Sequence, residues 1–459
     1  METHDEDRGG YDAFCAMEAP VVVASGVDST NGWRYEDRLI GMTRNAKAAN
    51  RKRLRVYLDP APHVVLSQSV PLRGWYKAKV EAAGVRPRPC YTEALLTQPY
   101  GGACPVRCFF CYINNGVRGY RGQGVTVVDP SYPEKTAAQL AKMRTGAAAY
   151  ISSFTEPFQP ALEPHYRVTE RLAHVFSRVG LPIFFLSRQV PPSWVVDVLR
   201  ANPYSYQQFS VNTPDPATWR KMSPRAAPLP AILDAIRELR AAGIYISIQV
   251  NPLLPGVVRP AEADALVALL AEAGAHHLIF KFVEVVHPAA EALRSRVRRL
   301  FGDERADEFD ALLVDSIGGV KTVREEYRIG ELQRLQRECS RHGMTMGLCY
   351  EYRYGRDAEG NVVDRAGESL GPMFTTGDQC HGRRVPVFSR PSADVAFEPI
   401  SGCPPAGCLY CREEAGPAPP CGNLGLQEAR ALVASDLTKV AWTTKHAAIA
   451  AALSGGRRK

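Results

Sequence analysis

The feature that most constrains this chain is a regular alternation of short apolar segments and amphipathic segments between residues 91 and 350. Strands are predicted at 91–97, 148–154, 182–187, 207–211, 245–250, 278–284 and 345–350. Helices are predicted between them at 133–144, 162–179, 193–201, 230–242, 261–273 and 325–342. Strands that alternate with helices form a parallel sheet with right-handed crossovers. The prediction is an α/β fold, a complete or partial TIM-like barrel whose chemistry lies at the carboxyl ends of its strands.

The alternation divides the chain into an N-terminal extension (1–90), the barrel (91–350) and a C-terminal extension (351–459). Residues 1–40 lack periodicity and are predicted to form a flexible or loosely packed arm. The tail ends in an Ala-rich helix pattern at 426–453. Three domains are an ordinary number for 459 residues.

Six basic residues accumulate just after that arm, and the whole chain carries a net charge of +8. They are Arg44, Lys47, Arg51, Lys52, Arg53 and Arg55. No aromatic residues interleave them, so a solvated helix face is favoured over contacts with phosphates. The charge is compatible with a nucleic-acid partner but does not require one.

The N-terminus is acidic and lacks the basic and apolar parts of an export signal, and no apolar stretch is long enough to span a bilayer. A cytoplasmic protein with no membrane partner is therefore expected. In that compartment thiols stay reduced, so the clustered members of the twelve cysteines favour metal binding over disulfides.

The first cysteine group is Cys104, Cys108 and Cys111, with the spacing C-x3-C-x2-C. Three thiolates on one short loop can hold three irons of a [4Fe–4S] cluster and leave the fourth iron open to a substrate or cofactor. The alternatives are structural zinc and unrelated buried cysteines. The nearest histidines in the sequence, His63 and His165, are distant from the loop.

These cysteines, with Phe110 before the last of them and Tyr112 after it, resemble the signature of the radical S-adenosylmethionine (SAM) superfamily. The resemblance implies a partial (β/α)6 barrel with SAM bound at the open iron, in contact with Tyr112. It implies reductive cleavage of SAM to a 5′-deoxyadenosyl radical, with electrons from a partner such as flavodoxin or ferredoxin.

The resemblance also implies SAM contacts at three strand ends. The second strand would bind the amino group, the third the carboxylate through an Arg fork, and the fourth the ribose. For each residue, a loop cap or a satisfied polar group is the alternative. The residues are Ser152, Ser153, Thr155, Glu156, Ser187, Arg188, Ser210 and Asn212.

The segment 152–160 resembles the S-x-T-[D/E]-P-[Y/F]-Q-P element of the spore photoproduct lyase-like group within this superfamily. Spore photoproduct lyase uses a further cysteine near this strand as a hydrogen donor. This chain has no cysteine between Cys111 and Cys339. That difference disfavours repair of the same DNA lesion.

The second cysteine group is Cys403, Cys408, Cys411 and Cys421, which could ligate an auxiliary [4Fe–4S] cluster or a structural zinc ion. Cys380, beside His381, could replace Cys421 in that set. Outside both groups, Cys349 ends the last predicted strand and is a candidate catalytic residue, as hydrogen donor or ligand; an inert buried thiol is the alternative. Glu284 and His287 are candidates for substrate contact.

These observations predict a radical SAM enzyme of the lyase or tailoring (transferase) type, acting on a small-molecule or peptide substrate. A DNA lesion lyase similar to spore photoproduct lyase, which makes nucleic acid the partner, is the second hypothesis. A non-catalytic metal-binding protein is the third.

Overall fold

The computed structural model describes residues 21–41, 51–67, 72, 94–111, 124–317, 320–349, 351–353, 355–356, 358, 362–364 and 370–400. Tyr112, the cysteines from Cys403 onward, the helix predicted at 426–453 and the side chain of His287 lie outside this description.

The centre of the fold is a seven-stranded parallel sheet in the order β17-β13-β12-β11-β10-β9-β5. Each strand pairs with the strand of this sheet that precedes or follows it along the chain, as repeated right-handed crossovers require. All seven predicted strands are confirmed, and with them the α/β fold. The strands are β5 (Ala94–Thr97), β9 (Ala148–Ile151), β10 (Ile183–Ser187), β11 (Tyr206–Ser210), β12 (Tyr245–Leu253), β13 (His277–Phe282) and β17 (Thr345–Leu348).

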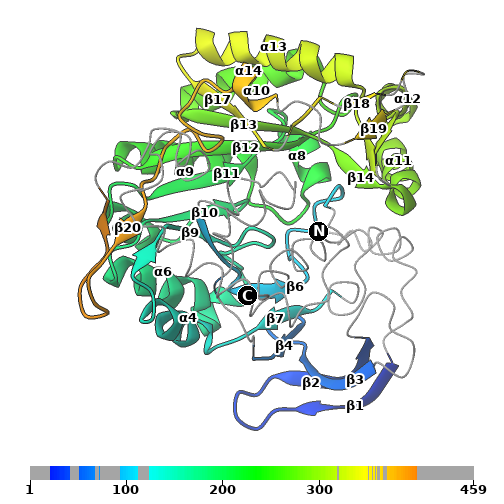
Figure 1. Cartoon of the computed structure of the whole chain (residues 1–459). Coiled ribbons are helices and arrows are strands. Elements are labelled where there is room, and N and C mark those ends of the chain that lie inside the picture. Colours follow the sequence, from blue (N-terminus) through cyan, green and yellow to red (C-terminus); the bar gives the residue numbers. More distant parts are fainter. Residues whose placement is uncertain are drawn as a thin grey trace.

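Helices pack on one face of this sheet (Figure 1). The helix predicted at 162–179 is divided in two, because Arg167 adopts a left-handed conformation with φ of 48°. The predicted set is α4 (Tyr132–Leu140), α5 (Glu163–Tyr166), α6 (Val168–Arg178), α7 (Trp194–Arg200), α9 (Leu229–Ala241), α10 (Pro260–Ala273) and α13 (Glu325–Arg341). Helices not predicted from the sequence are α8 (Pro216–Met222), α11 (His287–Phe301), α12 (Asp303–Leu312) and α14 (Gly371–Phe374).

The two faces of the sheet carry different side chains, because successive residues of a strand point in opposite directions. Phe209, Ile248 and Phe280 belong to the main core that the helices cover. The opposite face, called the inner face below, holds a smaller cluster in which the ring of Phe184 stacks on Tyr150 and Tyr206, at centroid distances of 4.5 and 4.6 Å. The same alternation places Ser210, Lys281 and Cys349 on the inner face, towards the carboxyl ends of the strands.

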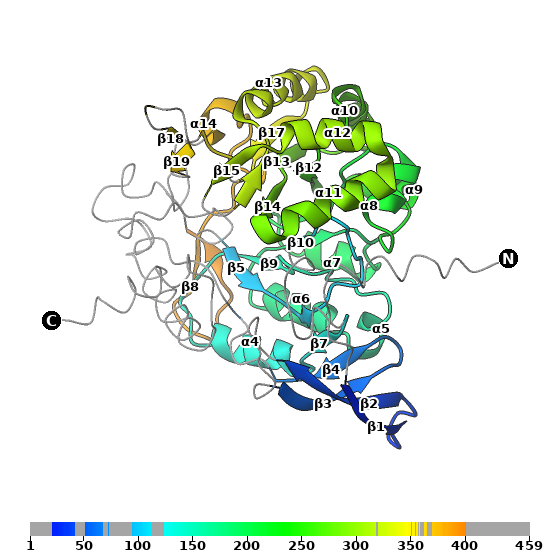
Figure 2. The ribbon, with the colours of Figure 1, turned by 90° about the vertical axis from the view of Figure 1, so that its right-hand side faces the viewer.

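A second sheet of six strands, in the order β1-β2-β3-β4-β7-β6, projects at the lower end of the molecule in Figures 1 and 2. Its strands are β1 (Val21–Val27), β2 (Arg34–Gly41), β3 (Arg51–Tyr57), β4 (His63–Val65), β6 (Tyr100–Gly102) and β7 (Thr126–Val128).

This sheet corrects two expectations. The prediction of a flexible arm was wrong for residues 21–40, which form a paired hairpin with a Val-rich first strand. The prediction of a helix face was wrong for residues 51–55. In β3 the apolar Leu54 and Val56 alternate with the exposed Arg53 and Arg55, which is the period of a strand with one face on a small core.

The remaining strands are short: β8 (Thr145–Gly146), β14 (Glu284–Val286), β15 (Asp315–Ile317), β16 (Val320–Thr322), β18 (Gly355–Arg356), β19 (Val362–Asp364), β20 (Phe388–Ser389) and β21 (Glu398–Pro399). Cys380 and His381 lie against the inner face, where His381 bonds to Gln208 (2.8 Å) and the carbonyl of Cys380 contacts His277 (3.0 Å). Among the described helices, none is both long and apolar enough to cross a bilayer.

Candidate active site

The first cysteine group follows β6 on a loop whose entry requires glycine. Gly102 has φ of 71°, and a Cβ there would lie 2.4 Å from the carbonyl oxygen of Val125. Cys108 is 8% exposed, and Cys104 and Cys111 are half-buried. Burial, and then the neighbouring thiols of Cys108 and Cys111, raises the pKa of Cys104 well above its ordinary value. The amide of Cys111 donates to the carbonyl of Cys108 (3.1 Å), so the three cysteines lie on one tightly turned loop.

The cysteine loop is bound to the segment that follows α8. The amide of Phe109 donates to the carbonyl of Met222 (3.1 Å), and the amide of Arg225 donates to the carbonyl of Val106 (3.3 Å). Between these two bonds, the hydroxyl of Ser223 lies 3.2 Å from the sulfur of Cys108. The loop is thus held by backbone bonds on both sides of Cys108.

The predicted residues at the end of β9 contact the base of the same loop. Ser152 is fully buried with φ of 67°, and its hydroxyl donates to the carbonyl of Thr155 (2.8 Å). The hydroxyl of Thr155 donates to the carbonyl of Tyr100 (2.7 Å), which also accepts from the side-chain amide of Gln98 (2.6 Å). Ser153 beside them is half-buried. Backbone strain of this kind at Ser152 is typical of functional sites.

Glu156 connects the end of β9 to the end of β10. Its carboxylate is 3% exposed and accepts hydrogen bonds from the hydroxyl of Ser187 (2.6 Å) and the amides of Arg188 (2.9 Å) and Phe158 (3.1 Å). Burial raises the pKa of Glu156 to about 7, against the opposing effect of these hydrogen bonds. A buried carboxyl with a pKa near neutrality can hold or release a proton at the pH of a cell.

Arg188 lies between the strand ends and the cysteine loop. Its Nη2 donates to the side-chain oxygen of Asn212 (2.5 Å) and its Nη1 to the hydroxyl of Ser223 (3.2 Å). Its guanidinium carbon lies 5.3 Å from the ring centroids of both Phe110 and Trp219. The predicted residues Arg188 and Asn212 are therefore brought together, in contact with the residue before Cys111.

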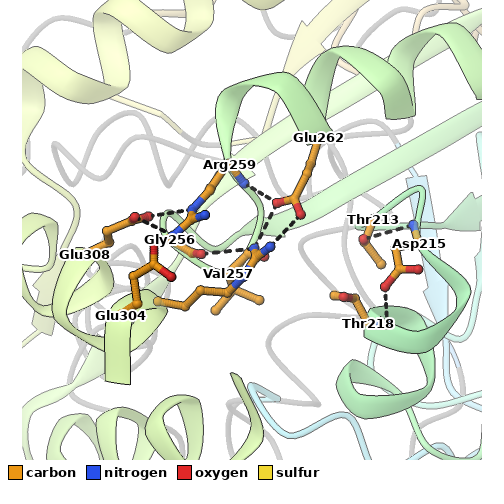
Figure 3. Close-up of polar contacts among 10 residues, drawn as sticks. Thr213, Asp215, Thr218, Gly256, Val257, Arg259, Glu262, Glu304 and Glu308 are labelled. Carbon is orange, nitrogen blue, oxygen red and sulfur yellow. Dashed lines mark hydrogen bonds and ion pairs between the residues drawn. The ribbon is translucent and has the colours of Figure 1, made fainter. Parts of the chain in front are cut away.

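The carboxyl end of β12 is bound to this group, and the loop after it is bound to α12. The side-chain amide of Asn212 donates to the carbonyl of Pro252 in β12 (2.9 Å). Farther along, Arg305 donates to the carbonyl of Val257 (2.7 Å) and pairs with Glu262, while Arg259 pairs with Glu308 (Figure 3). These contacts fix the loop after β12 beside the end of β11.

Cys349 and the charged residues near it lie at the β17 edge of the sheet, opposite the β5 edge. The amide of Cys349 donates to the carbonyl of Phe280 (2.9 Å), which makes Lys281 its neighbour on the inner face. The ammonium of Lys281 lies 3.1 Å from Glu284 and 4.0 Å from Glu351. Cys349 is half-buried, and it follows the carboxyl end of β17.

No model of a known protein family matches the sequence. A curated relative, the radical SAM Nalpha-GlyT isomerase of Pseudomonas phage M6, is 43% identical over 422 residues, which cover 90% of this chain and 87% of the relative. The chain belongs to the radical SAM enzymes.

Two kinds of solved structure resemble this radical SAM enzyme at a lower level. A Cys-to-Ser mutant of spore photoproduct lyase is 14% identical, with a TM-score of 0.44 over 62% of this chain and 81% of that one. SuiB of Streptococcus suis, bound to its precursor peptide SuiA, is 14% identical, with a TM-score of 0.32 over 44% of this chain and 41% of that one. Neither likeness is strong enough to carry an argument about activity.

The cysteine loop of this radical SAM enzyme fits a [4Fe–4S] cluster. Within the described part of the chain, no three His, Cys, Asp or Glu side chains are arranged to hold a single metal ion. A cluster does not need that arrangement, because each cysteine binds a different iron. The nearest histidines are engaged elsewhere: the rings of His63 and His165 pack on Trp33, at 5.4 and 5.5 Å.

Several residues of the site were not predicted from the sequence. Ser223 follows a short helix in an unremarkable segment, and Gln98 lies outside every motif. Arg296 donates to the carbonyl of Phe109 (2.7 Å) although 187 residues separate them. Lys281 lies in an apolar strand between Phe280 and Phe282. A single charged residue in such a strand is unusual, and this could have indicated a functional role.

Proposed function

We propose that the chain is a radical SAM isomerase that acts on the Nalpha-GlyT substrate named for its phage relative. The observation that carries the proposal is 43% identity over 90% of the chain. The position of Cys104, Cys108 and Cys111 on one short loop after β6 supports it. When bound, the cluster and SAM supply a 5′-deoxyadenosyl radical that removes a hydrogen atom from the substrate.

The residues of this chain bind and orient the cluster and SAM. Cys104, Cys108 and Cys111 hold the cluster. Glu156 and Arg188, at neighbouring strand ends beside the cysteine loop, contact the SAM methionyl group. The other residues proposed to contact SAM are Tyr112, Ser152, Ser153, Thr155, Ser187, Ser210 and Asn212. What supports this assignment is that Thr155, Glu156, Arg188 and Asn212 are linked by hydrogen bonds to the cysteine loop or to one another.

The inner face forms the substrate site of a partial (β/α)6-type barrel, in which the substrate lies between the cysteine loop and β17. Cys349 is proposed to return a hydrogen atom to the rearranged substrate; its thiyl radical then regains the thiol by taking one electron from the reducing partner and one proton from water. Cys349 is half-buried on the inner face, next to the charged group of Lys281 and Glu284. Lys281 and Glu284 offer one donor and one acceptor to a polar substrate.

The test uses the full chain, purified and reconstituted with iron and sulfide without oxygen, then mixed with dithionite, SAM and Nalpha-GlyT. We expect 5′-deoxyadenosine and a product of unchanged mass but different chromatographic retention. The Cys108→Ala variant should yield neither and should lose iron, whereas Cys339→Ala, the same deletion in α13, should keep both. Wild-type protein with full iron content and no 5′-deoxyadenosine would overturn the proposal.

A solvent-isotope experiment tests Cys349 separately. A thiol exchanges its hydrogen with water, so a reaction run in D2O should place one carbon-bound deuterium in the product. With Cys349→Ala we expect loss of that deuterium and accumulation of 5′-deoxyadenosine without product. Unlabelled product from the wild type would show that Cys349 is not the donor.

The C-terminal cysteines Cys403, Cys408, Cys411 and Cys421 are proposed to form a second metal site, a cluster or zinc. Metal analysis separates the two: about eight irons per chain indicate two clusters, and about four irons plus one zinc indicate a structural zinc. The Cys408→Ala/Cys411→Ala variant should lose the second metal alone. Electrons are proposed to come from a flavodoxin or ferredoxin.

A further inference from the structure

We propose that Ser223 is a positioning residue for the cluster, whose hydrogen bond to the sulfur of Cys108 makes the cluster easier to reduce. The proposal rests on the cluster of the proposed function. Ser223 is 1% exposed and Cys108 is 8% exposed, and their side chains meet at 3.2 Å. Water therefore does not compete for this contact.

The position of Ser223 is set by the backbone on both sides of it. Its amide donates to the carbonyl of Trp219 (2.9 Å) at the end of α8, and its own carbonyl accepts from Ala226 (3.0 Å). The start of α8 is fixed by Asp215, whose carboxylate accepts from the amide of Thr218 (2.7 Å; Figure 3). With the flanking bonds to the cysteine loop, these contacts leave Ser223 little freedom to turn away from Cys108.

The neighbouring Arg188 determines the direction of the hydrogen bond. A guanidinium donates but never accepts, and a hydroxyl has one hydrogen and two lone pairs. Because Nη1 of Arg188 donates to the hydroxyl of Ser223 at 3.2 Å, the hydroxyl accepts there and keeps its hydrogen for the sulfur of Cys108. A hydroxyl that accepts from a cation is also a better donor, since bonds in a chain polarise one another.

The consequence is electrostatic. Reduction adds one negative charge to a cluster, and hydrogen bonds to its sulfur ligands stabilise the more negative form. Ser223 places one such donor at Cys108, with the fixed charge of Arg188 directly behind it. The reduced state is therefore favoured, which makes it easier for the cluster to accept an electron from the reducing partner.

A redox titration of the reconstituted full chain, followed by electron paramagnetic resonance, tests the proposal. We expect Ser223→Ala to shift the ratio of reduced to oxidised cluster about tenfold towards oxidised at a fixed potential, a lowering of about 59 mV for one electron. Ser223→Thr, which keeps the hydroxyl, should stay near the wild type, as should Ser340→Ala on the far helix α13. An unchanged potential in Ser223→Ala with full iron content would overturn the proposal.

A second measurement begins with the wild type and does not depend on the Ser223→Ala variant. Electron–nuclear double resonance of the reduced wild type should show a proton coupled to the cluster that disappears after exchange into D2O and that Ser223→Thr retains. If Ser223→Ala does not keep its iron, absence of this exchangeable proton in the wild type overturns the proposal. Wild-type protein that assembles no cluster would instead contradict the proposed function.

Discussion

The hydroxyl of Thr155 donates a 2.7 Å hydrogen bond to the main-chain carbonyl of Tyr100, and this bond joins the end of β9 to the strand that leads into the cysteine loop. Both residues are buried. The contact means that a residue predicted to touch SAM also holds the loop that carries the cluster ligands.

Thr155→Val should therefore destabilise the cysteine loop, although valine and threonine have nearly the same shape. We expect a loss of about 1 to 2 kcal/mol in the free energy of unfolding, since a buried hydrogen bond is removed at constant volume. Iron retention after gel filtration should fall as well. Thr155→Ser keeps the hydroxyl and serves as the control. Equal stability of the Val and Ser variants would contradict the prediction.

The ion pair between Arg328 and Glu351 is almost completely buried, and the Glu351 carboxylate also accepts from the amide of Phe282 (2.8 Å). Glu351→Leu should destabilise the protein by about 3 to 5 kcal/mol, because it leaves a buried guanidinium without its partner. The double variant Arg328→Met/Glu351→Leu should recover most of that loss. Urea denaturation measures both.

An exposed pair provides the contrast. Asp234 and Arg237 are 2.8 Å apart on the surface of α9, and Asp234→Asn should change the free energy of unfolding by less than about 1 kcal/mol. If the exposed and the buried substitutions cost the same, burial is not the cause of the Glu351 effect.

Gly382 packs directly against His277. It has φ of 80°, and a Cβ there would lie 2.2 Å from the Cγ of His277. We expect Gly382→Ala to destabilise the protein by about 2 to 5 kcal/mol, from the collision and the left-handed backbone together. Gly343→Ala is the matched control, since Gly343 has φ of 69° with no atom within 4 Å, and should cost only about 1 to 2 kcal/mol. Thermal unfolding distinguishes the two.

His277 should make stability depend on pH. Burial lowers its pKa from 6.5 to about 4, so between these values the unfolded chain binds a proton that the folded chain does not. The contribution of His277 is complete above pH 6.5 and decreases as the pH falls towards 4. Between pH 7 and pH 5 the loss should be about 2 kcal/mol.

The measurement is the difference between the wild type and His277→Gln, which keeps a donor for the carbonyl of Cys380 but does not titrate. A difference is needed because burial raises the pKa of Glu156 to about 7 and also raises that of Glu163, which acts in the opposite direction over the same pH range. Parallel pH profiles of the two proteins would contradict the prediction.

The parallel sheet and most of its helices were predictable because their signals are local. Apolar strands such as 182–187 and amphipathic helices such as 230–242 carry their period within a few residues. The cysteine loop was predictable for the same reason, since Cys104, Cys108 and Cys111 lie within eight residues. The strand β3 was missed, because its alternation is only a few residues long and is dominated by its basic residues.

The sequence by itself determined the elements of the sheet, the family resemblance and the position of the three thiols. The tertiary structure alone decided what surrounds those thiols. Ser223 lies 115 residues from Cys108 along the chain and yet contacts its sulfur, and Arg188 reaches Ser223 across another 35. Contacts of this kind depend on how strands and helices pack together in the fold. The local periodicity of a sequence does not contain that information.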